Sequence, residues 1–228
     1  MPNETSLLSR VSPAVQDYVK ALYMLSSDGG DKLVPTTAVA ERLGVSAASA
    51  TKMLKRLAGL GLATHESYRG GALTAPGVRI ALEVIRHHRL LETYLAEALG
   101  VPWDEVHEEA EVLEHVLSEG LEDRIAALLG DPSRDPHGHP IPAKDGSIAT
   151  TADKTLWDCA DGESAQVGRV SDHEPSVLRY LGDVGIRPGT RVEIVERGPV
   201  GGPLFVRVGS NTDVTALSKE LSEGVWVD

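Results

Sequence analysis

The chain has 228 residues, 41% of them hydrophobic, a formal net charge of −12 and one cysteine, Cys159. A lone cysteine excludes an intrachain disulfide and predicts a buried thiol in a reducing, cytoplasmic setting. No apolar run approaches the roughly 20 residues that cross a bilayer, so no membrane partner is expected, and the length predicts two or three domains.

The charge is distributed unevenly along the chain. Residues 1–80 hold 9 Lys/Arg against 6 Asp/Glu, residues 81–150 hold 5 against 15, and residues 151–228 hold 8 against 13. A mildly basic first third suits phosphates, whereas an acidic middle third suits cations. The net acidity of the whole chain therefore does not exclude a nucleic-acid partner.

The first third predicts three helices followed by a hairpin. Apolar residues spaced for one helix face run over 12–25, with Pro13 in the first turn. Thr36 or Thr37 is expected to cap a short helix through Leu43, and Ser46 to cap a second helix to about Leu60. Two helices joined at a glycine predict a helix-turn-helix. The segment 61–77 alternates and is expected to turn on Gly70 and Gly71, as the wing of a winged helix does.

Helical periodicity returns from Pro76 to Leu99 and from Trp103 to about Leu129, which predicts two or three long helices. The segment 131–146 is dense in Pro and Gly and predicts a loop. From Glu163 the chain shows short β-rich segments at 164–172, 190–198, 203–210 and 224–228, with a helix over 175–185. Together they predict a mainly α protein with a small β domain, an SH3-like barrel.

The second helix of the helix-turn-helix carries the residues expected to contact DNA. Small side chains at its start allow close approach to base edges, and the donors and cations that follow suit bases and phosphates. The alternative is an ordinary helical hairpin with a solvated basic face. The predicted wing that follows favours the DNA-binding interpretation over this alternative. The predicted DNA-binding residues are Thr36, Ser46, Ala47, Ala48, Ser49, Thr51, Lys52, Lys55, Arg56 and, at the wing tip, Arg69.

The acidic middle third carries HRLLE at 88–92 and HEEAEVLEH at 107–115. On a helix, residues three or four apart share a face, which pairs His88 with Glu92 and His107 with Glu111. The same spacing puts Glu114 and His115 on the face of Glu111, one turn further on. Imidazoles with carboxylates and no thiolate suit Mn2+, Fe2+ or Zn2+. The alternative is a pair of solvated helix faces, but that does not explain why so many ligand types gather on adjoining segments.

The sequence resembles the diphtheria-toxin-repressor family of metal-dependent regulators over nearly its whole length. The resemblance rests on AERLGVSAASATKMLKRLAGLGL, HRLLE, VHEEAEVLEHVLSEGLEDRI and DPHGHPIP. It implies a winged helix-turn-helix DNA-binding domain over 1–75, a helical metal-binding and dimerisation domain over 76–148, a linker over 149–162 and an SH3-like domain over 163–228. It also implies a homodimer that binds double-stranded operator DNA.

The resemblance implies two metal sites, called the primary site and the ancillary site. The primary site would use Asp17, Glu111, Glu114 and His115, and the ancillary site would use His88, Glu92 and His107 with help from the SH3-like domain. In the family that help comes from a Glu followed three residues later by Gln. In this sequence, those two places hold Glu174 and Val177, and Asp172 and His173 are nearby substitutes.

Two positions bear on which metal is sensed. Iron-responsive relatives carry Met and Cys where this chain has Asp17 and Glu111, and manganese-responsive relatives carry Asp and Glu. Hard carboxylates favour Mn2+, whereas thioether and thiolate ligands favour softer or later ions. Two-domain manganese sensors add a Glu one turn after the Asp, where this chain has Lys20.

The expected function is that of a repressor activated by Mn2+, with Fe2+ as the alternative signal and with Co2+, Ni2+, Zn2+ or Cd2+ able to act in vitro. No enzymatic activity is expected. A metallohydrolase would need an open ligand position for water and would leave the helix-turn-helix without a role. A metal-storage protein would bind no operator.

Overall fold

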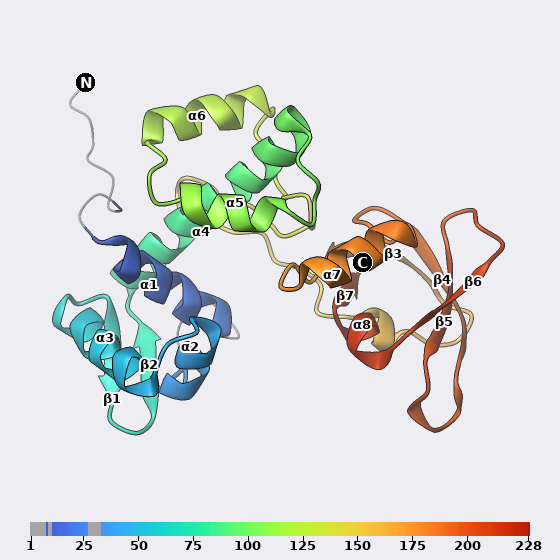
Figure 1. Ribbon diagram of the computed structural model, residues 1–228, viewed down its shortest axis with the longest axis horizontal. Coiled ribbons are helices and arrows are strands. Elements are labelled where there is room, and N and C mark those ends of the chain that lie inside the picture. The colour runs from blue at the N-terminus through green and yellow to red at the C-terminus, as the bar shows by residue number, and fades with distance from the viewer. Residues whose placement is uncertain (1–7, 9–10, 27–32) are drawn as a thin grey trace. The chain divides into compact units, whose positions relative to one another are not determined.

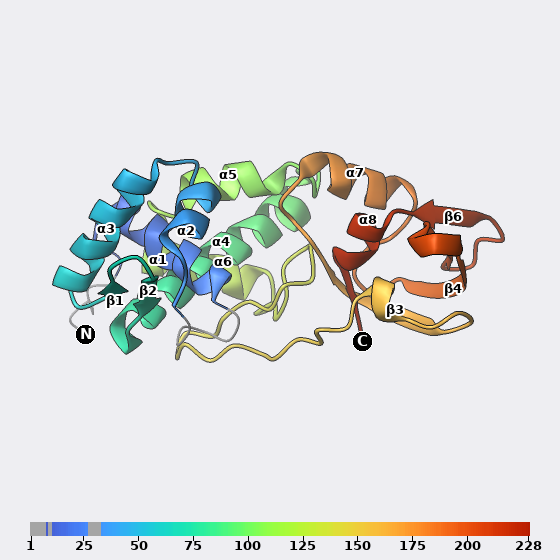
Figure 2. The ribbon, with the colours of Figure 1, turned by 90° about the horizontal axis from the view of Figure 1, so that it is seen from below.

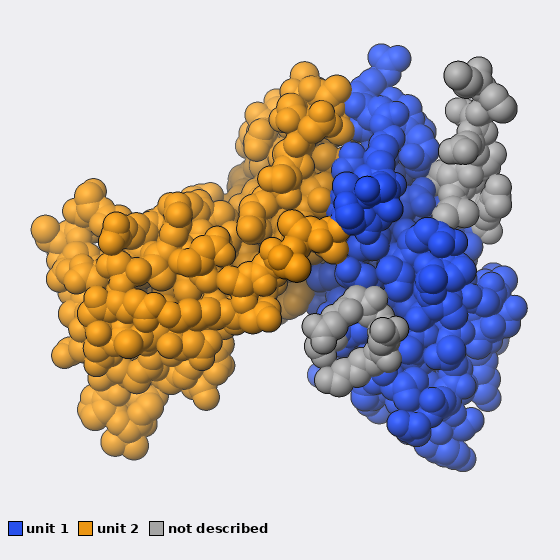
Figure 3. Space-filling model, turned by 180° about the vertical axis from the view of Figure 1, so that it is seen from behind, with its two compact units in different colours: residues 1–88, 112–124, 142–147 blue, residues 89–111, 125–141, 148–228 orange. Residues whose placement is uncertain are grey.

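The computed structural model describes residue 8 and residues 11–26 and 33–228. The chain forms two compact units, which Figure 3 distinguishes by colour. Unit 1 comprises residues 1–88, 112–124 and 142–147, and unit 2 comprises residues 89–111, 125–141 and 148–228. Both units are therefore assembled from segments that are far apart in the sequence.

Unit 1 contains a winged helix-turn-helix (Figure 1). Its elements are α1 (Pro13–Leu25), α2 (Thr36–Arg42), α3 (Ala47–Gly59), β1 (Ala63–Glu66) and β2 (Gly70–Leu73). The Ser46 side chain accepts a hydrogen bond from the Ser49 amide and caps α3, as predicted. Apolar side chains from all three helices and the hairpin form one core, which includes Val19, Leu22, Val39, Leu54, Leu57 and Leu73.

Two local predictions in this region are wrong. Neither Thr36 nor Thr37 caps α2, because the helix already begins at Thr36 and Pro35 is its N-cap. The hairpin turns at residues 67–69, with Tyr68 at φ 65°, and not on the two glycines, which belong to β2. Gly70 instead allows β2 to lie close to the Val34 backbone, because a Cβ at this position would stand 1.9 Å from the Val34 carbonyl oxygen.

Three further helices follow the hairpin: α4 (Ala75–Leu99), α5 (Val106–Leu113) and α6 (Glu119–Leu128). This agrees with the two or three long helices predicted, and the stretch from Trp103 to about Leu129 divides into α5 and α6 at a turn formed by residues 114–116. The Val116 amide donates to the Leu113 carbonyl at 3.1 Å, which tightens the end of α5. As a result, Glu114 and His115 lie in a turn and not on a helix face, contrary to the predicted helical spacing.

The C-terminal part of unit 2 is a five-stranded antiparallel sheet in the order β6-β5-β4-β3-β7. Its strands β3, β4 and β6 are labelled in Figure 2. Sequence periodicity predicted four of these strands but missed β6 and the short helix α8. Among the side chains that fill its core are Leu156 and Cys159, both from the segment predicted as a linker. The elements are β3 (Ser164–Val170), α7 (Pro175–Asp183), β4 (Arg191–Arg197), β5 (Leu204–Val208), β6 (Val214–Leu217), α8 (Lys219–Glu223) and β7 (Val225–Val227).

Even the 25-residue helix α4 lacks the character of a membrane span, because charged and polar residues interrupt it throughout. Among the described residues, no helix is both long and apolar enough to cross a bilayer.

Candidate metal centre

Glu114 is the central residue of the candidate primary site in unit 1. Its side chain is fully buried, and Lys20 donates to its Oε2 at 2.7 Å. The Nδ1 of His88 lies 2.6 Å from the same oxygen and 3.1 Å from the Lys20 ammonium. One carboxylate oxygen is thus held by two basic groups, which fixes the direction of the other.

The second oxygen, Glu114 Oε1, is buried and has no hydrogen-bond partner. It lies 3.7 Å from His115 Nε2, and that nitrogen lies 2.9 Å from Asp17 Oδ1 on α1. The His115 Nδ1 contacts the Gln16 side-chain oxygen at 2.7 Å, which leaves Nε2 as the nitrogen that faces the carboxylates. Ligand atoms of Asp17, Glu114 and His115 lie within 4.8 Å of one another. A buried oxygen without a hydrogen-bond partner in a mixed carboxylate and imidazole set fits a divalent cation.

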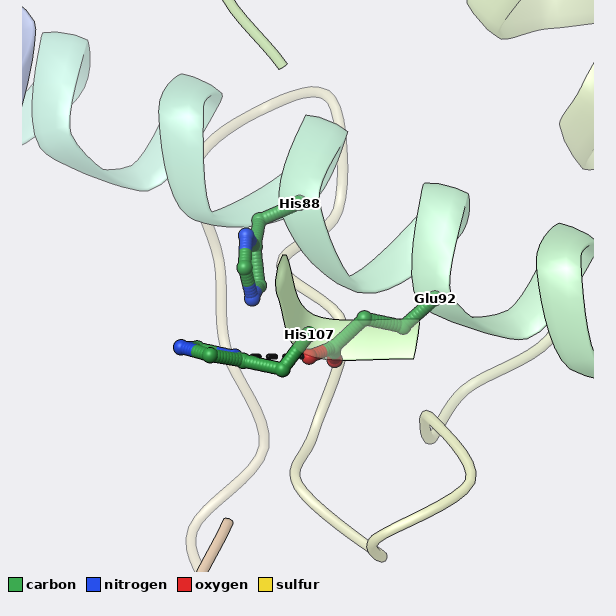
Figure 4. A group of neighbouring side chains, drawn as sticks. All are labelled: His88, Glu92 and His107. Carbon is green, nitrogen blue, oxygen red and sulfur yellow. Dashed lines mark hydrogen bonds and ion pairs between the residues drawn. The ribbon is translucent and has the colours of Figure 1, made fainter. Parts of the chain in front are cut away.

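The candidate ancillary residues are arranged around α4 (Figure 4). His88 and Glu92 lie one turn apart on this helix, as the spacing predicted. His107 lies at the start of α5, and its Nδ1 is 3.1 Å from Glu92 Oε1 (dashed line in Figure 4). Since His88 Nδ1 faces Glu114, its Nε2 is the nitrogen suited to a metal ion, and a carboxylate behind a ligating histidine is the usual second partner.

Glu111, assigned by resemblance to the primary site, contacts a residue assigned to the ancillary site. Its Oε1 lies 3.9 Å from His107 Nε2 within α5, and its side chain is 43% exposed. An exposed carboxylate on a helix end can change rotamer at little cost, so this position is compatible with either assignment.

The SH3-like domain offers Asp172 in preference to Glu174. Glu174 is exposed at the start of α7, whereas Asp172 is largely buried and its Oδ2 lies 3.7 Å from His139 Nδ1. The charge of His139, with smaller contributions from His173 and His137, lowers the pKa of Asp172 although burial and Glu92 oppose this. Asp172 is therefore an anion that faces a group of buried histidines.

Those histidines belong to the loop 131–146, which was not among the predicted site residues. His137 and His139 are both buried, and so is Asp135. Although burial lowers the pKa of His137, its interaction with Glu92 and the charge of Asp135 raise it to about 9. The sequence signal was the DPHGHP segment itself, whose two histidines and one aspartate were attributed to a connecting loop.

A further buried cluster joins α4 to α6. Glu122 Oε2 lies 3.5 Å from His87 Nε2, and Arg86 donates to Glu122 Oε1. Burial would raise the pKa of Glu122, but the hydrogen bonds and charges of His87 and Arg86 lower it to about 2. The same ion pairing raises the pKa of His87 despite its burial. In this cluster the carboxylate of Glu122 pairs with the basic side chains of Arg86 and His87, and these ion pairs hold α4 and α6 together.

We expect Glu122→Gln to lower the free energy of unfolding by about 3 kcal/mol at pH 7, since each pKa unit corresponds to roughly 1.36 kcal/mol. The carboxylate's contribution is complete above its unfolded pKa of 4.5 and is lost as pH falls toward about 2. The deficit should therefore shrink between pH 5 and pH 3. Urea unfolding at both pH values measures it.

The control for that comparison is Asp123→Asn, whose side chain is 60% exposed and pairs with Lys144 at the surface. We expect this change to cost less than about 1 kcal/mol. An equal deficit for the Gln variant at pH 5 and pH 3 would contradict the assigned ion pair.

None of the predicted DNA-binding residues is buried. Ser46, Ala47, Ala48 and Ser49 are exposed at the start of α3, and Lys52, Lys55 and Arg56 are exposed along it. A hollow of about 410 Å³ between α2, α3 and the wing is lined by Thr36, Ala47, Thr51 and Lys55. Arg69 pairs with Glu66 across the wing turn. Tyr68, which was not predicted, lies fully exposed at the wing tip beside it.

Comparisons with known proteins give similarity over the whole architecture. Residues 10–71 match the iron dependent repressor N-terminal DNA binding domain, and residues 74–143 match the iron dependent repressor metal binding and dimerisation domain. Residues 154–228 match the FeoA domain.

Two curated relatives are repressors of similar length. The iron-dependent repressor IdeR of Mycobacterium tuberculosis is 32% identical over 92% of this chain and 95% of its own. The diphtheria toxin repressor of Corynebacterium diphtheriae is 33% identical over 79% of this chain and 83% of its own.

Among solved structures, a manganese-dependent transcriptional repressor in complex with manganese is 42% identical, with a TM-score of 0.86 over 93% of this chain and 98% of its own. The structure of ScaR with bound Cd2+ is 28% identical, with a TM-score of 0.79 over 94% of this chain and 98% of its own.

Proposed function

This chain belongs to the diphtheria-toxin-repressor family of metal-dependent regulators, and from that premise we propose that it responds to Mn2+ and binds operator DNA as a homodimer. The family is one of DNA-binding transcriptional repressors and not of enzymes, so the chain is a metal-dependent repressor. We place its action in the cytoplasm, with its DNA. The domain boundaries at 75, 148 and 162 are part of the same proposal.

The observation that carries the proposal is the meeting of Asp17 with Glu114 and His115. Asp17 lies on α1 of the winged helix, whereas Glu114 and His115 follow α5. When bound, a divalent cation supplies the positive charge that such a set of carboxylates lacks. Two hard carboxylates and one imidazole, without a thiolate, are the donors expected for Mn2+, which binds weakly by the Irving–Williams order.

Lys20 reduces the number of metal ions that the primary site needs for charge balance. Its ammonium already neutralises Glu114 Oε2, so only Oε1 points toward His115 and Asp17. A site for one ion follows, unlike the paired site expected where a Glu occupies the place of Lys20. Because Oε2 also holds His88, the same carboxylate links the primary residues to an ancillary ligand.

The connection to DNA runs through α1. Its buried face packs in the same core as α3, so restraining Asp17 restrains the orientation of the helix that carries Lys52 and Arg56. In a homodimer, two restrained winged helices would match two operator half-sites, and the metal-free protein would lose entropy on binding DNA. Linkage then requires DNA to tighten metal binding by the same factor.

The test is fluorescence anisotropy of DNA from upstream of the protein's own gene, titrated with Mn2+, Fe2+, Co2+ and Zn2+ in turn under anaerobic conditions. We expect DNA binding only in the presence of a metal ion. Relative to the amount of each ion in the cell, Mn2+ should give half-maximal DNA binding at a lower free concentration than Fe2+, Co2+ or Zn2+. Fe2+ is the second candidate because the curated relative IdeR is named an iron-dependent repressor. Equal DNA binding with and without every ion would refute a metal-dependent repressor.

Metal preference should follow Asp17 and Glu111. We expect Asp17→Met with Glu111→Cys to move the response from Mn2+ toward Fe2+, Co2+ or Ni2+, because a thioether and a thiolate replace two hard oxygens. Both side chains are more than a third exposed, so the fold should persist. The measurement is the concentration of each ion that gives half-maximal DNA binding. An unchanged ranking of ions would place selectivity elsewhere.

A further inference from the structure

We propose that Asp135, His137, His139 and Asp172 form a structural site for a zinc-class divalent cation, which is separate from the primary site, adjoins the ancillary residue Glu92 and uses Asp172 as its own ligand. All four residues belong to unit 2. Ligand atoms of Asp135, His137 and His139 lie within 4.8 Å of one another, and Asp172 reaches the group from the segment after β3. This inference goes beyond the proposed function and does not depend on it.

The first support is a set of buried atoms that lack hydrogen-bond partners. They are His137 Nδ1, His139 Nδ1 and Asp135 Oδ2, on side chains that are at least nine-tenths buried. His137 Nε2 is 2.7 Å from the Trp103 carbonyl oxygen, to which it donates, so in the neutral imidazole that a metal ion binds, Nδ1 carries the lone pair that faces inward. Three such atoms in one cluster are costly unless something satisfies them together.

The second support is the spacing between these atoms. His139 Nδ1 lies 3.5 Å from Asp135 Oδ2 and 3.7 Å from Asp172 Oδ2, and His137 Nδ1 lies 3.8 Å from Glu92 Oε2. These separations are too long for direct hydrogen bonds. Two ligands of one tetrahedral zinc ion at about 2.0 Å stand roughly 3.3 Å apart, so a modest closure would complete the coordination.

The third support is the rigidity of the loop. The second oxygen of Asp135, Oδ1, accepts from the His137 and His139 amides at 2.8 and 3.0 Å. The His137 carbonyl accepts from the Val170 amide, which joins the loop to the sheet. Gly138 adopts φ 90°, and a Cβ there would stand 2.2 Å from the Gly168 carbonyl oxygen. The ligands are therefore held in place before any ion binds.

Charge and chemistry decide the class of ion. Asp135 and Asp172 bring two negative charges into a buried space, with Arg89 Nε 3.6 Å from Asp135 Oδ2 as the nearby cation. Imidazole nitrogens and carboxylate oxygens are ligands that zinc accepts, and four of them in a closed, buried arrangement suit its tetrahedral coordination. The sensing residues Asp17 and Glu111 are more exposed, as suits an ion that must exchange.

The experiment uses the full chain with His88→Asn, His107→Asn and His115→Asn, which removes a ligand from each sensing site and leaves all carboxylates in place. After loading with Zn2+ and dialysis against a weak chelator, we expect this background to retain about one Zn2+ per chain by elemental analysis. The Co2+-loaded background should show the intense visible absorption of tetrahedral cobalt. EDTA should lower its melting temperature.

Adding His139→Asn to the background should abolish the retained ion, the cobalt spectrum and the effect of EDTA. Adding Asp172→Asn, at a position less buried than His139, should weaken them in the same way while preserving the fold. The matched control, His65→Asn on β1 of the wing, should change none of them. No ion in the background, or an ion retained by both the His139 and Asp172 variants, would overturn the proposed site.

Discussion

Glu114→Gln should abolish metal-activated DNA binding at metal concentrations that saturate the unmodified protein. The buried Oε1 is the only atom of this side chain that points toward His115 and Asp17, and Oε2 holds Lys20 and His88. The amide keeps the shape of the side chain but removes its charge, so the ligand weakens and the Lys20 ammonium loses its counter-ion. Both consequences lower metal affinity.

The expected size is a rise of at least about 100-fold in the metal concentration for half-maximal DNA binding, since changing even an outer-shell partner costs 10- to 100-fold. Anisotropy with labelled DNA measures this shift, and isothermal titration calorimetry without DNA measures the loss of metal affinity directly. Glu109→Gln is the matched control, because Glu109 is exposed on α5 and makes the same change of charge. A response of the Glu114 variant within about threefold of the control would remove Glu114 from the metal site.

Lys52→Ala combined with Arg56→Ala should weaken DNA binding by about 100-fold at moderate salt while leaving the metal affinity of the free protein unchanged. Both side chains are exposed on α3, away from the buried face that includes Leu54 and Leu57. Each lost phosphate contact should also lower the slope of log affinity against log salt by about one.

Arg124→Ala combined with Lys219→Ala provides the comparison at equal charge change, because both residues are exposed and lie outside the winged helix. We expect this control to retain its affinity and its salt slope to within experimental error. Melting temperatures should be the same for both double variants. If the control loses as much affinity as the α3 variant, net charge and not a defined contact explains the effect.

The sequence by itself determined those helices and strands whose pattern of apolar and capping residues lies within a short stretch of the chain. Helical periodicity and the Ser46 cap predicted α1 and α3, the winged helix-turn-helix is confirmed, and the pairing of His88 with Glu92 follows from their spacing on one helix. The resemblance to a known family added the three-part architecture, which the family matches confirm. Local periodicity works here because an amphipathic helix records its buried face in its own residues.

Tertiary structure alone decided how the candidate metal ligands are distributed. The spacing of Glu111, Glu114 and His115 predicted one helix face, but α5 ends at Leu113, and the turn that follows directs Glu114 toward Lys20. Nothing local connects Lys20 to Glu114, which lies 94 residues further along the chain. Likewise, Asp172 meets His139 only because β3 and the 131–146 loop pack together. Such contacts depend on burial and long-range charge, which no short sequence window contains.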